Sequence, residues 1–132
     1  MSTLKVTNIG QRVDLDIFQG ATFGPMTHRL LNSDNSRYDL TGVQLTAEVR
    51  KSPDDSAAEC EFEVAIGSPA TDGEYSLLLE ADDTAALEAG NSISEQKSIH
   101  WYDVRMVAVS GEVIYTLYGA LRVWRRVTRP AP

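Results

Sequence analysis

Apolar and polar residues alternate along much of the chain, and this alternation predicts strands with one buried and one exposed face. In segment 12–18 the apolar positions Val13, Leu15 and Ile17 share one face. Segment 43–50 repeats the pattern with four apolar residues on one face: Val43, Leu45, Ala47 and Val49. Both segments are predicted to be half-buried strands of antiparallel sheets.

Turn residues mark the limits of further strands. A turn at 52–55, with Pro53 at its corner, precedes segment 59–66, in which apolar residues alternate with three glutamates. A tight turn at 71–74 leads into a strand over 75–79, and segments 22–31 and 38–41 are weaker strand candidates. Gly20 to Pro25 lacks the sequence of a phosphate-binding loop, so we expect a turn there, with Pro25 at a sheet edge.

The C-terminal part carries the most apolar strands. Segment 101–109 is apolar on both faces, as a central strand is, and Ser110-Gly111 predicts a hairpin turn into a strand over 112–118. Gly119-Ala120 predicts a bulge or kink before a last strand over 121–127.

One segment favours a helix instead. Residues 81–90 are rich in helix formers, begin with carboxylates suited to capping and end at Gly90. We expect one or two helical turns bridging two sheets, followed by a polar loop over 91–98. The predicted fold is all-β: an immunoglobulin-like antiparallel β-sandwich of about seven to nine strands with one short helix. It forms a single domain over 1–132, with flexible ends at 1–10 and 128–132.

The length and composition agree with such a fold. A chain of 132 residues buries roughly two-thirds of its unfolded surface, enough for a two-layer core. No apolar run approaches the roughly 20 residues that span a membrane. Residues 1–10 contain no continuous apolar stretch, so a secretory signal is not expected.

The charge of the chain is unevenly distributed. The net charge of −7 argues against nucleic-acid binding, which needs a basic patch. Segment 54–95 contains twelve acidic residues and no Lys or Arg, whereas segment 122–129 contains four arginines and no acid. Two interpretations are open: complementary surfaces that dock copies or partners, or a solvated acidic face with a basic tail.

No arrangement of residues predicts catalysis, a metal or a cofactor. Cys60 is the only cysteine, and we expect it to be a buried, inert thiol, since the flanking glutamates raise a thiol pKa. A metal site of His28, His100 and Asp103 is conceivable, but no short-spaced ligand pair supports it. Asp14 and Asp16 share a strand face with nothing nearby to raise either pKa, so we expect them to serve solubility.

Aromatic residues of the C-terminal part are candidates for binding. They form either a sugar-stacking platform or core and interface anchors, and we favour the second interpretation. The residues are Trp101, Tyr102, Tyr115, Tyr118 and Trp124.

The last predicted strand supplies a candidate interface. Alternation places Arg122, Trp124 and Arg126 on one face, with Leu121, Val123 and Val127 on the other. Because Trp and Arg are enriched in binding hot spots, the first three residues form the candidate interface. The alternative is that Trp124 caps one end of the sandwich beside solvated arginines.

Several short motifs, taken in order, resemble a family of small phage and prophage structural proteins with immunoglobulin-like folds. These are Asp16 to Phe23, Tyr38 to Gly42 before Val49-Arg50-Lys51, Trp101 to Arg105 before Ser110 to Val113, and Gly119 to Val123 before Val127-Thr128-Arg129. The chain departs from the pattern at Asn91 to His100, which separates Gly90 from the Trp101 strand.

The resemblance implies a non-enzymatic structural role in a tail, baseplate or fibre-associated protein. Its expected partners are copies of itself and other virion proteins, without nucleic acid or membrane, in the virion and, during assembly, the host cytoplasm. The alternative function is a small carbohydrate- or receptor-binding β-sandwich.

Overall fold

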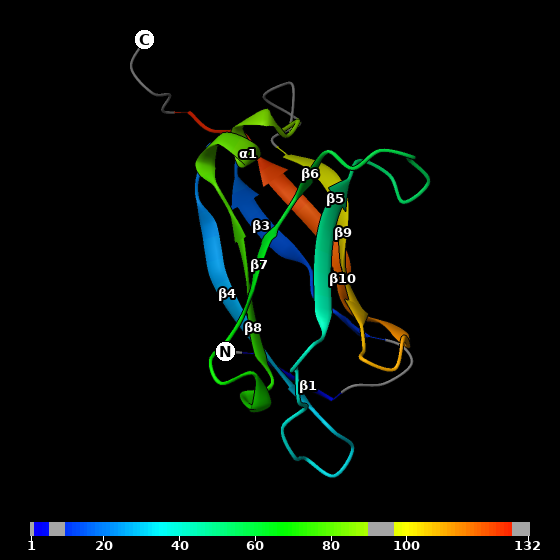
Figure 1. Ribbon diagram of the computed structural model, residues 1–132. Coiled ribbons are helices and arrows are strands. Elements are labelled where there is room, and N and C mark those ends of the chain that lie inside the picture. The colour runs from blue at the N-terminus through cyan, green and yellow to red at the C-terminus, as the bar shows by residue number, and fades with distance from the viewer. Residues whose placement is uncertain (1, 6–9, 90–96, 128–132) are drawn as a thin grey trace.

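Strands dominate the protein, and one short helix lies at one end of the two sheets (Figure 1). The computed structural model describes residues 2–5, 10–89 and 97–127. The strands are β1 (Ser2–Lys5), β2 (Gln11–Arg12), β3 (Leu15–Phe18), β4 (Phe23–Leu31), β5 (Gln44–Arg50), β6 (Cys60–Glu61), β7 (Glu63–Ile66), β8 (Glu74–Leu79), β9 (Lys97–Val107) and β10 (Val113–Trp124). The helical segments are the 3₁₀ turn η1 (Ala70–Asp72) and the helix α1 (Ala81–Ala86).

The strands form a four-stranded sheet with the order β1-β4-β8-β7 and a six-stranded sheet with the order β2-β10-β9-β5-β6, in which β3 also pairs with β10. The prediction of an all-β sandwich-like fold with one short helix is confirmed. The sheets are mixed, however, because β1 pairs with β4, and β2 and β3 pair with β10, in parallel. β1 also lies within the predicted flexible end 1–10.

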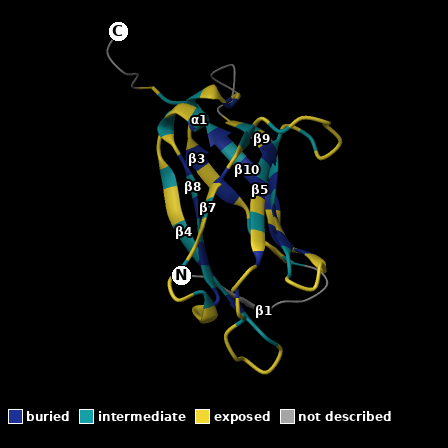
Figure 2. Cartoon of the chain, in the orientation of Figure 1, coloured by how far each residue is buried: buried dark blue, intermediate teal, exposed yellow. Residues whose placement is uncertain are grey.

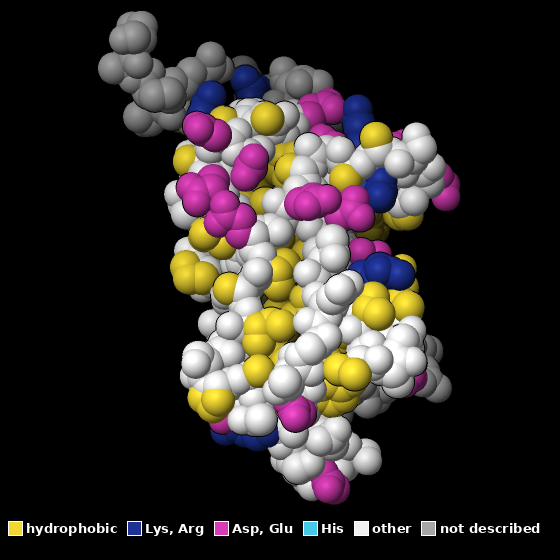
Figure 3. Space-filling view, in the orientation of Figure 1, with side chains coloured by type: hydrophobic (Ala, Val, Ile, Leu, Met, Phe, Trp, Pro, Cys, Tyr) yellow, Lys and Arg dark blue, Asp and Glu magenta, His cyan; other side chains and the backbone are white. Residues whose placement is uncertain are grey.

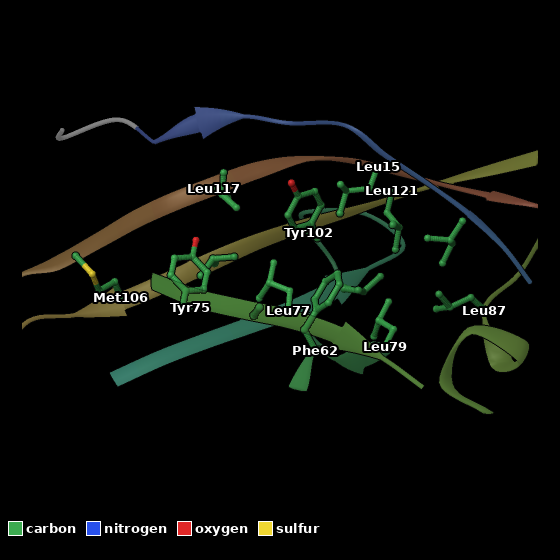
Figure 4. Close-up of a cluster of buried hydrophobic side chains, with 14 of the residues drawn as sticks. Leu15, Phe62, Tyr75, Leu77, Leu79, Leu87, Tyr102, Met106, Leu117 and Leu121 are labelled. Carbon is green, nitrogen blue, oxygen red and sulfur yellow. The ribbon is translucent and has the colours of Figure 1, made fainter. Parts of the chain in front are cut away.

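The hydrophobic core lies between the two sheets. Leu30 and Leu77 of one sheet and Val104 and Leu117 of the other are completely buried. Burial alternates along the strands, as the sequence predicts, so each sheet keeps an exposed outer face (Figure 2). In Figure 4, the labelled side chains of both sheets point into the space between them.

The predicted strand over 59–66 is two strands in different sheets. β6 pairs with β5, whereas β7 pairs with β8, and Phe62 lies at the crossing with its N–H donating to the Ala47 carbonyl at 2.9 Å. Phe62 is buried against Phe23 and Tyr102, at centroid distances of 6.2 and 5.8 Å. The bend takes Ile66 out of the core and leaves it 38% exposed, contrary to the alternation.

β10 differs from its prediction at two points. The strand runs without a break through Gly119, and its bulge lies between Tyr115 and Leu117, so that Thr116 and Leu117 are both buried. Gly119 instead permits close approach, since a Cβ there would collide with the Val13 carbonyl oxygen. Val127, predicted to face the core, is 95% exposed because the strand ends at Trp124.

The connection between the sheets contains α1, as predicted, between β8 of one sheet and β9 of the other. The helix ends at Ala86, and its N-cap residue Glu80 makes no side-chain capping bond. The predicted stop at Gly90 and loop residues 91–96 lie outside the described residues, and Lys97 and Ser98 belong to β9. Segment 38–41 is not a strand: residues 38–40 are irregular and lead into a turn at 41–42, in which the Val43 N–H donates to the Leu40 carbonyl.

Predictions about the strand β4 and about membrane-spanning segments are also tested by the structure. Segment 22–31 is confirmed as a strand, with Pro25 exposed at an irregularity in the pairing of β4 with β8. Among the described residues, no helix has the length and apolar character needed to cross a membrane.

Candidate functional site

Two of the three candidate interface residues lie on β10, on the outer face of the six-stranded sheet. Trp124 is paired with Phe18 of β3 on one side and with Lys97 of β9 on the other. The Lys97 ammonium lies 4.8 Å from the centroid of the Trp124 ring, within cation–π range. Arg126 follows the end of the strand, so it does not continue the alternation of Arg122 and Trp124.

Asp16 of β3 binds both Arg122 and Trp124. Its Oδ1 accepts hydrogen bonds from Arg122 Nε at 2.7 Å and from Trp124 Nε1 at 2.9 Å, and its Oδ2 accepts one from Arg122 Nη2 at 2.8 Å. The Arg122 and Trp124 hydrogen bonds hold the pKa of Asp16 well below its usual range. The expectation that Asp16 serves only solubility is therefore wrong: it neutralises Arg122 and fixes the Trp124 indole.

Asp14 also has a structural role. Its Oδ1 accepts a hydrogen bond from the Ala120 N–H at 3.0 Å and one from Arg12 Nε at 3.1 Å. These contacts lower the pKa of Asp14, and the hydrogen bond from the Ala120 N–H has the largest effect. The carboxylate thus ties the segment between β2 and β3 to β10, and the prediction of a purely solubilising role is wrong here as well.

Phe18 is the most exposed aromatic side chain near Trp124. It is 60% exposed and lines two hollows. One hollow, of about 400 Å³, is lined by Asp16, Ile17, Phe18 and Trp124. The other, of about 810 Å³, lies between Phe18, α1 and the segment after β10, where Arg126 and Val127 contribute. We call Phe18, Trp124, Arg126 and Val127 together the Phe18 surface.

The turn after β3 holds Phe18 in place. Gln19 donates from its N–H to the Trp124 carbonyl at 2.9 Å and from Nε2 to the Leu87 carbonyl at 2.8 Å. The buried Thr84 hydroxyl accepts from the Gly20 N–H at 3.0 Å and donates to the Ala21 carbonyl at 2.7 Å. The turn is thus attached to both β10 and α1, which fixes the position of Phe18 relative to both elements.

The charges beside this surface are incompletely compensated. Arg122 is paired with Asp16, but within the described part of the chain neither Arg125 nor Arg126 forms an ion pair. The Arg126 guanidinium lies against Gly20, where no side chain intervenes. Two arginine charges therefore remain available for an acidic partner.

A groove, distinct from the two hollows beside Phe18, lies farther along the same outer face. Glu48, Asp103 and Tyr118 are neighbours across β5, β9 and β10, and Trp101 lies two residues before Asp103. With Arg50 and the Pro53 turn they line a groove of about 210 Å³. Asp103 is half-buried, and burial, followed by the repulsion of Glu48, raises its pKa.

The five aromatic residues do not form one platform. Tyr102 is buried and donates its hydroxyl proton to the Val13 carbonyl. Trp101 and Tyr118 line the groove, Trp124 belongs to the Phe18 surface, and Tyr115 is 44% exposed.

The two histidines lie in different sheets, and both are completely buried. His28 lies beside Tyr75 with a ring centroid distance of 5.7 Å, whereas His100 bonds Glu59 Oε1 at 2.6 Å and the Glu88 carbonyl at 2.8 Å. Asp103 faces outward from β9 while His100 faces inward. The conceivable metal site is therefore not assembled, and the described residues contain no cluster of three possible ligands.

Cys60 is half-buried rather than fully buried, and it packs against the core. Burial, with smaller contributions from Asp83 and Glu59, raises the pKa of its thiol to about 11. The thiol is therefore protonated at neutral pH, and of the two flanking glutamates only Glu59 contributes in the expected direction.

Sequence reasoning missed Phe18 and the groove. Phe18 occupies the face that Asp14 and Asp16 occupy, and an aromatic residue on a polar face is a signal that points to a contact surface. The groove has no such signal, because it depends on which strands pair with β9.

Comparison with known proteins gives matches by structure but none by sequence. No protein-family model matches the chain, and no curated protein sequence is similar to it. A solved structure, the N-terminal domain of ORF48 from phage TP901-1, aligns over 96% of this chain and 98% of that chain, at 9% identity and a TM-score of 0.44.

Proposed function

We propose that this chain is a non-enzymatic assembly domain of a phage or prophage particle, associated with the tail or baseplate, and that it binds copies of itself through the Phe18 surface. The order of short motifs from Asp16 to Arg129 supports the phage assignment. The observation that carries the binding role is the 60% exposure of Phe18 beside Trp124.

The Phe18 surface has the properties of a protein contact site. Trp124 is fixed by Asp16, so little side-chain freedom remains to be lost when a partner binds. Val127 is 95% exposed, and it adds apolar area beside Phe18. Trp and Arg are the residue types that most often dominate binding energy.

Charge favours a second copy as the partner. Among the described residues the surface carries the unpaired Arg126, with the unpaired Arg125 beside it, whereas the chain as a whole has a net charge of −7. Unpaired acidic side chains lie away from this surface on the described chain, among them Glu61 and Asp103, and Figure 3 shows further acidic residues gathering near the α1 end, which borders the Phe18 surface. Because the two surfaces differ, the contact is heterologous, and such contacts build rings where the rotation closes.

Carbohydrate binding, the alternative function, has weaker support because Tyr102 is buried and Trp124 is bonded to Asp16. A glycan array tests it, and reproducible micromolar binding would favour this function over assembly.

Sedimentation velocity of the wild type and of Trp124→Ala tests the proposal. We expect the wild type to associate at micromolar concentration, and both the substitution and added salt to shift it towards the monomer. Circular dichroism establishes that the variant is folded. A wild type that stays monomeric, or an oligomer indifferent to both the substitution and salt, contradicts the proposal. For the phage assignment, we expect genes for tail components to flank this gene.

A further inference from the structure

The groove between β5, β9 and β10 contains a carboxylate without a partner. Asp103 is half-buried and, among the described residues, makes no hydrogen bond or ion pair. Its neighbour Glu48 is paired with Arg50, whose Nη2 lies 3.1 Å from Glu48 Oε2. The groove therefore holds one uncompensated negative charge, in surroundings that are partly shielded from water.

We propose that this groove binds an arginine side chain of a second copy of the chain, an inference that rests on the self-association proposed above. A cation placed beside Asp103 relieves the cost of a half-buried, unpaired charge. The raised pKa of Asp103 is consistent with an unpaired charge, since burial and the repulsion of Glu48 outweigh the attraction of Arg50.

The walls of the groove suit a guanidinium group in particular. Trp101 and Tyr118 present aromatic rings beside Asp103, and the planar guanidinium both stacks on such rings and pairs with carboxylates. Trp101 already makes one contact with a guanidinium group of its own chain, because the Arg12 guanidinium carbon lies 5.9 Å from the Trp101 ring centroid. The volume of about 210 Å³ has room for the end of one side chain.

We assign this arginine to Arg125 or Arg126 of another copy. Arg125 and Arg126 are unpaired within the described residues, and they follow the end of β10. The strand from Tyr118 to Trp124 spans roughly 20 Å at about 3.3 Å per residue. An arginine side chain does not bridge this distance, so Arg125 and Arg126 reach the groove only on a neighbouring molecule.

Binding of Nα-acetyl-arginine amide, followed by NMR of the ¹⁵N-labelled full chain, tests the groove itself. We expect the amide signals of Trp101, Asp103 and Tyr118 to shift, with at least tenfold weaker binding of the uncharged Nα-acetyl-citrulline amide. Asp103→Asn is expected to weaken arginine-amide binding about tenfold, whereas Glu112→Gln, at an exposed hairpin position, is the matched control and leaves it unchanged. Equal binding of both ligands, no shifts, or larger shifts with neutral methyl glycosides would overturn the proposal.

Sedimentation of the same two variants tests the source of the arginine. We expect Asp103→Asn to weaken self-association about tenfold and Glu112→Gln to leave it unchanged. Arginine-amide binding combined with unchanged association of Asp103→Asn would exclude a second copy as the source. If self-association depends on Trp124 but the groove does not bind the arginine amide, the groove is not an arginine site, while the proposed function stands.

Discussion

The carboxylate of Asp16 accepts a hydrogen bond from the Trp124 indole at 2.9 Å, and this bond fixes the largest side chain of the Phe18 surface. The same carboxylate pairs with Arg122, so one residue near the start of the chain orders two near its end. The assembly role proposed above depends on this arrangement, because an ordered tryptophan loses little freedom on binding.

Replacement of Asp16 by Asn is predicted to lower the free energy of unfolding at pH 7 by about 0.5–1 kcal/mol, the scale of a well-formed exposed ion pair. The pKa of Asp16 is lowered from 3.8 by Arg122 and Trp124, so this stability is complete above pH 3.8 and is lost as the pH falls through the lowered pKa. Urea unfolding measures the difference, with Asp54→Asn at an exposed position as the control. If the difference in unfolding free energy between the wild type and Asp16→Asn persists undiminished in strong acid, the ionised Asp16 carboxylate is not its source.

His28 is predicted to make the fold sensitive to mild acid. Burial lowers its pKa from 6.5 to about 4, so the folded state binds a proton less readily than the unfolded state. Stability due to His28 is complete above pH 6.5 and declines between pH 6.5 and about 4, by on the order of 3 kcal/mol. Unfolding measured across this range is expected to show a shallower decline in His28→Leu, and identical slopes would refute the role.

Cys60 is predicted to react slowly in the folded protein. A rise of its thiol pKa from 9.0 to about 11 reduces the thiolate fraction at neutral pH roughly 100-fold. A thiol reagent is therefore expected to label the native protein slowly and the urea-unfolded protein fast. Rapid native labelling would show that Cys60 is more accessible than its contact with the core indicates, and Cys60→Ala is expected to cost about 1 kcal/mol.

Gly119 is predicted to tolerate no side chain. A Cβ would collide with the Val13 carbonyl oxygen and lie 2.9 Å from Asp14 Oδ1, so Gly119→Ala is expected to cost about 1–3 kcal/mol. Gly67→Ala is the comparison, because its nearest contact, the Glu74 carbonyl oxygen, is at 3.2 Å. Thermal unfolding measures the loss of stability in both variants. Equal losses would contradict the close approach of β10 to Val13.

Alternation in the sequence predicts which side of a strand is buried, and this holds for Leu15, Ile17, Ala47 and Val49. It does not predict the partner of a strand or its direction, so the parallel pairing of β3 with β10 was missed. The crossing at Phe62 was missed for a related reason, since an alternating segment looks the same whether it stays in one sheet or enters a second.

The candidate interface shows the same limit. Alternation places Arg122 and Trp124 on one face, as found, but it has no means of showing that the strand ends at Trp124 and that Val127 is exposed. It also leaves Asp16 as an isolated surface acid, because the contact with Trp124 joins residues 108 positions apart. The groove beside Asp103 likewise depends on the pairing of β5 and β10 with β9.

Sedimentation equilibrium of Phe18→Ser tests the central claim most directly, because Phe18 is 60% exposed and its side chain makes no hydrogen bond. Val109→Ser is the matched control, since Val109 is 76% exposed in the hairpin turn after β9. We predict that the average mass of the wild type and of Val109→Ser rises with protein concentration, while Phe18→Ser stays at the monomer mass. A rise of equal size in all three proteins would contradict assembly through the Phe18 surface.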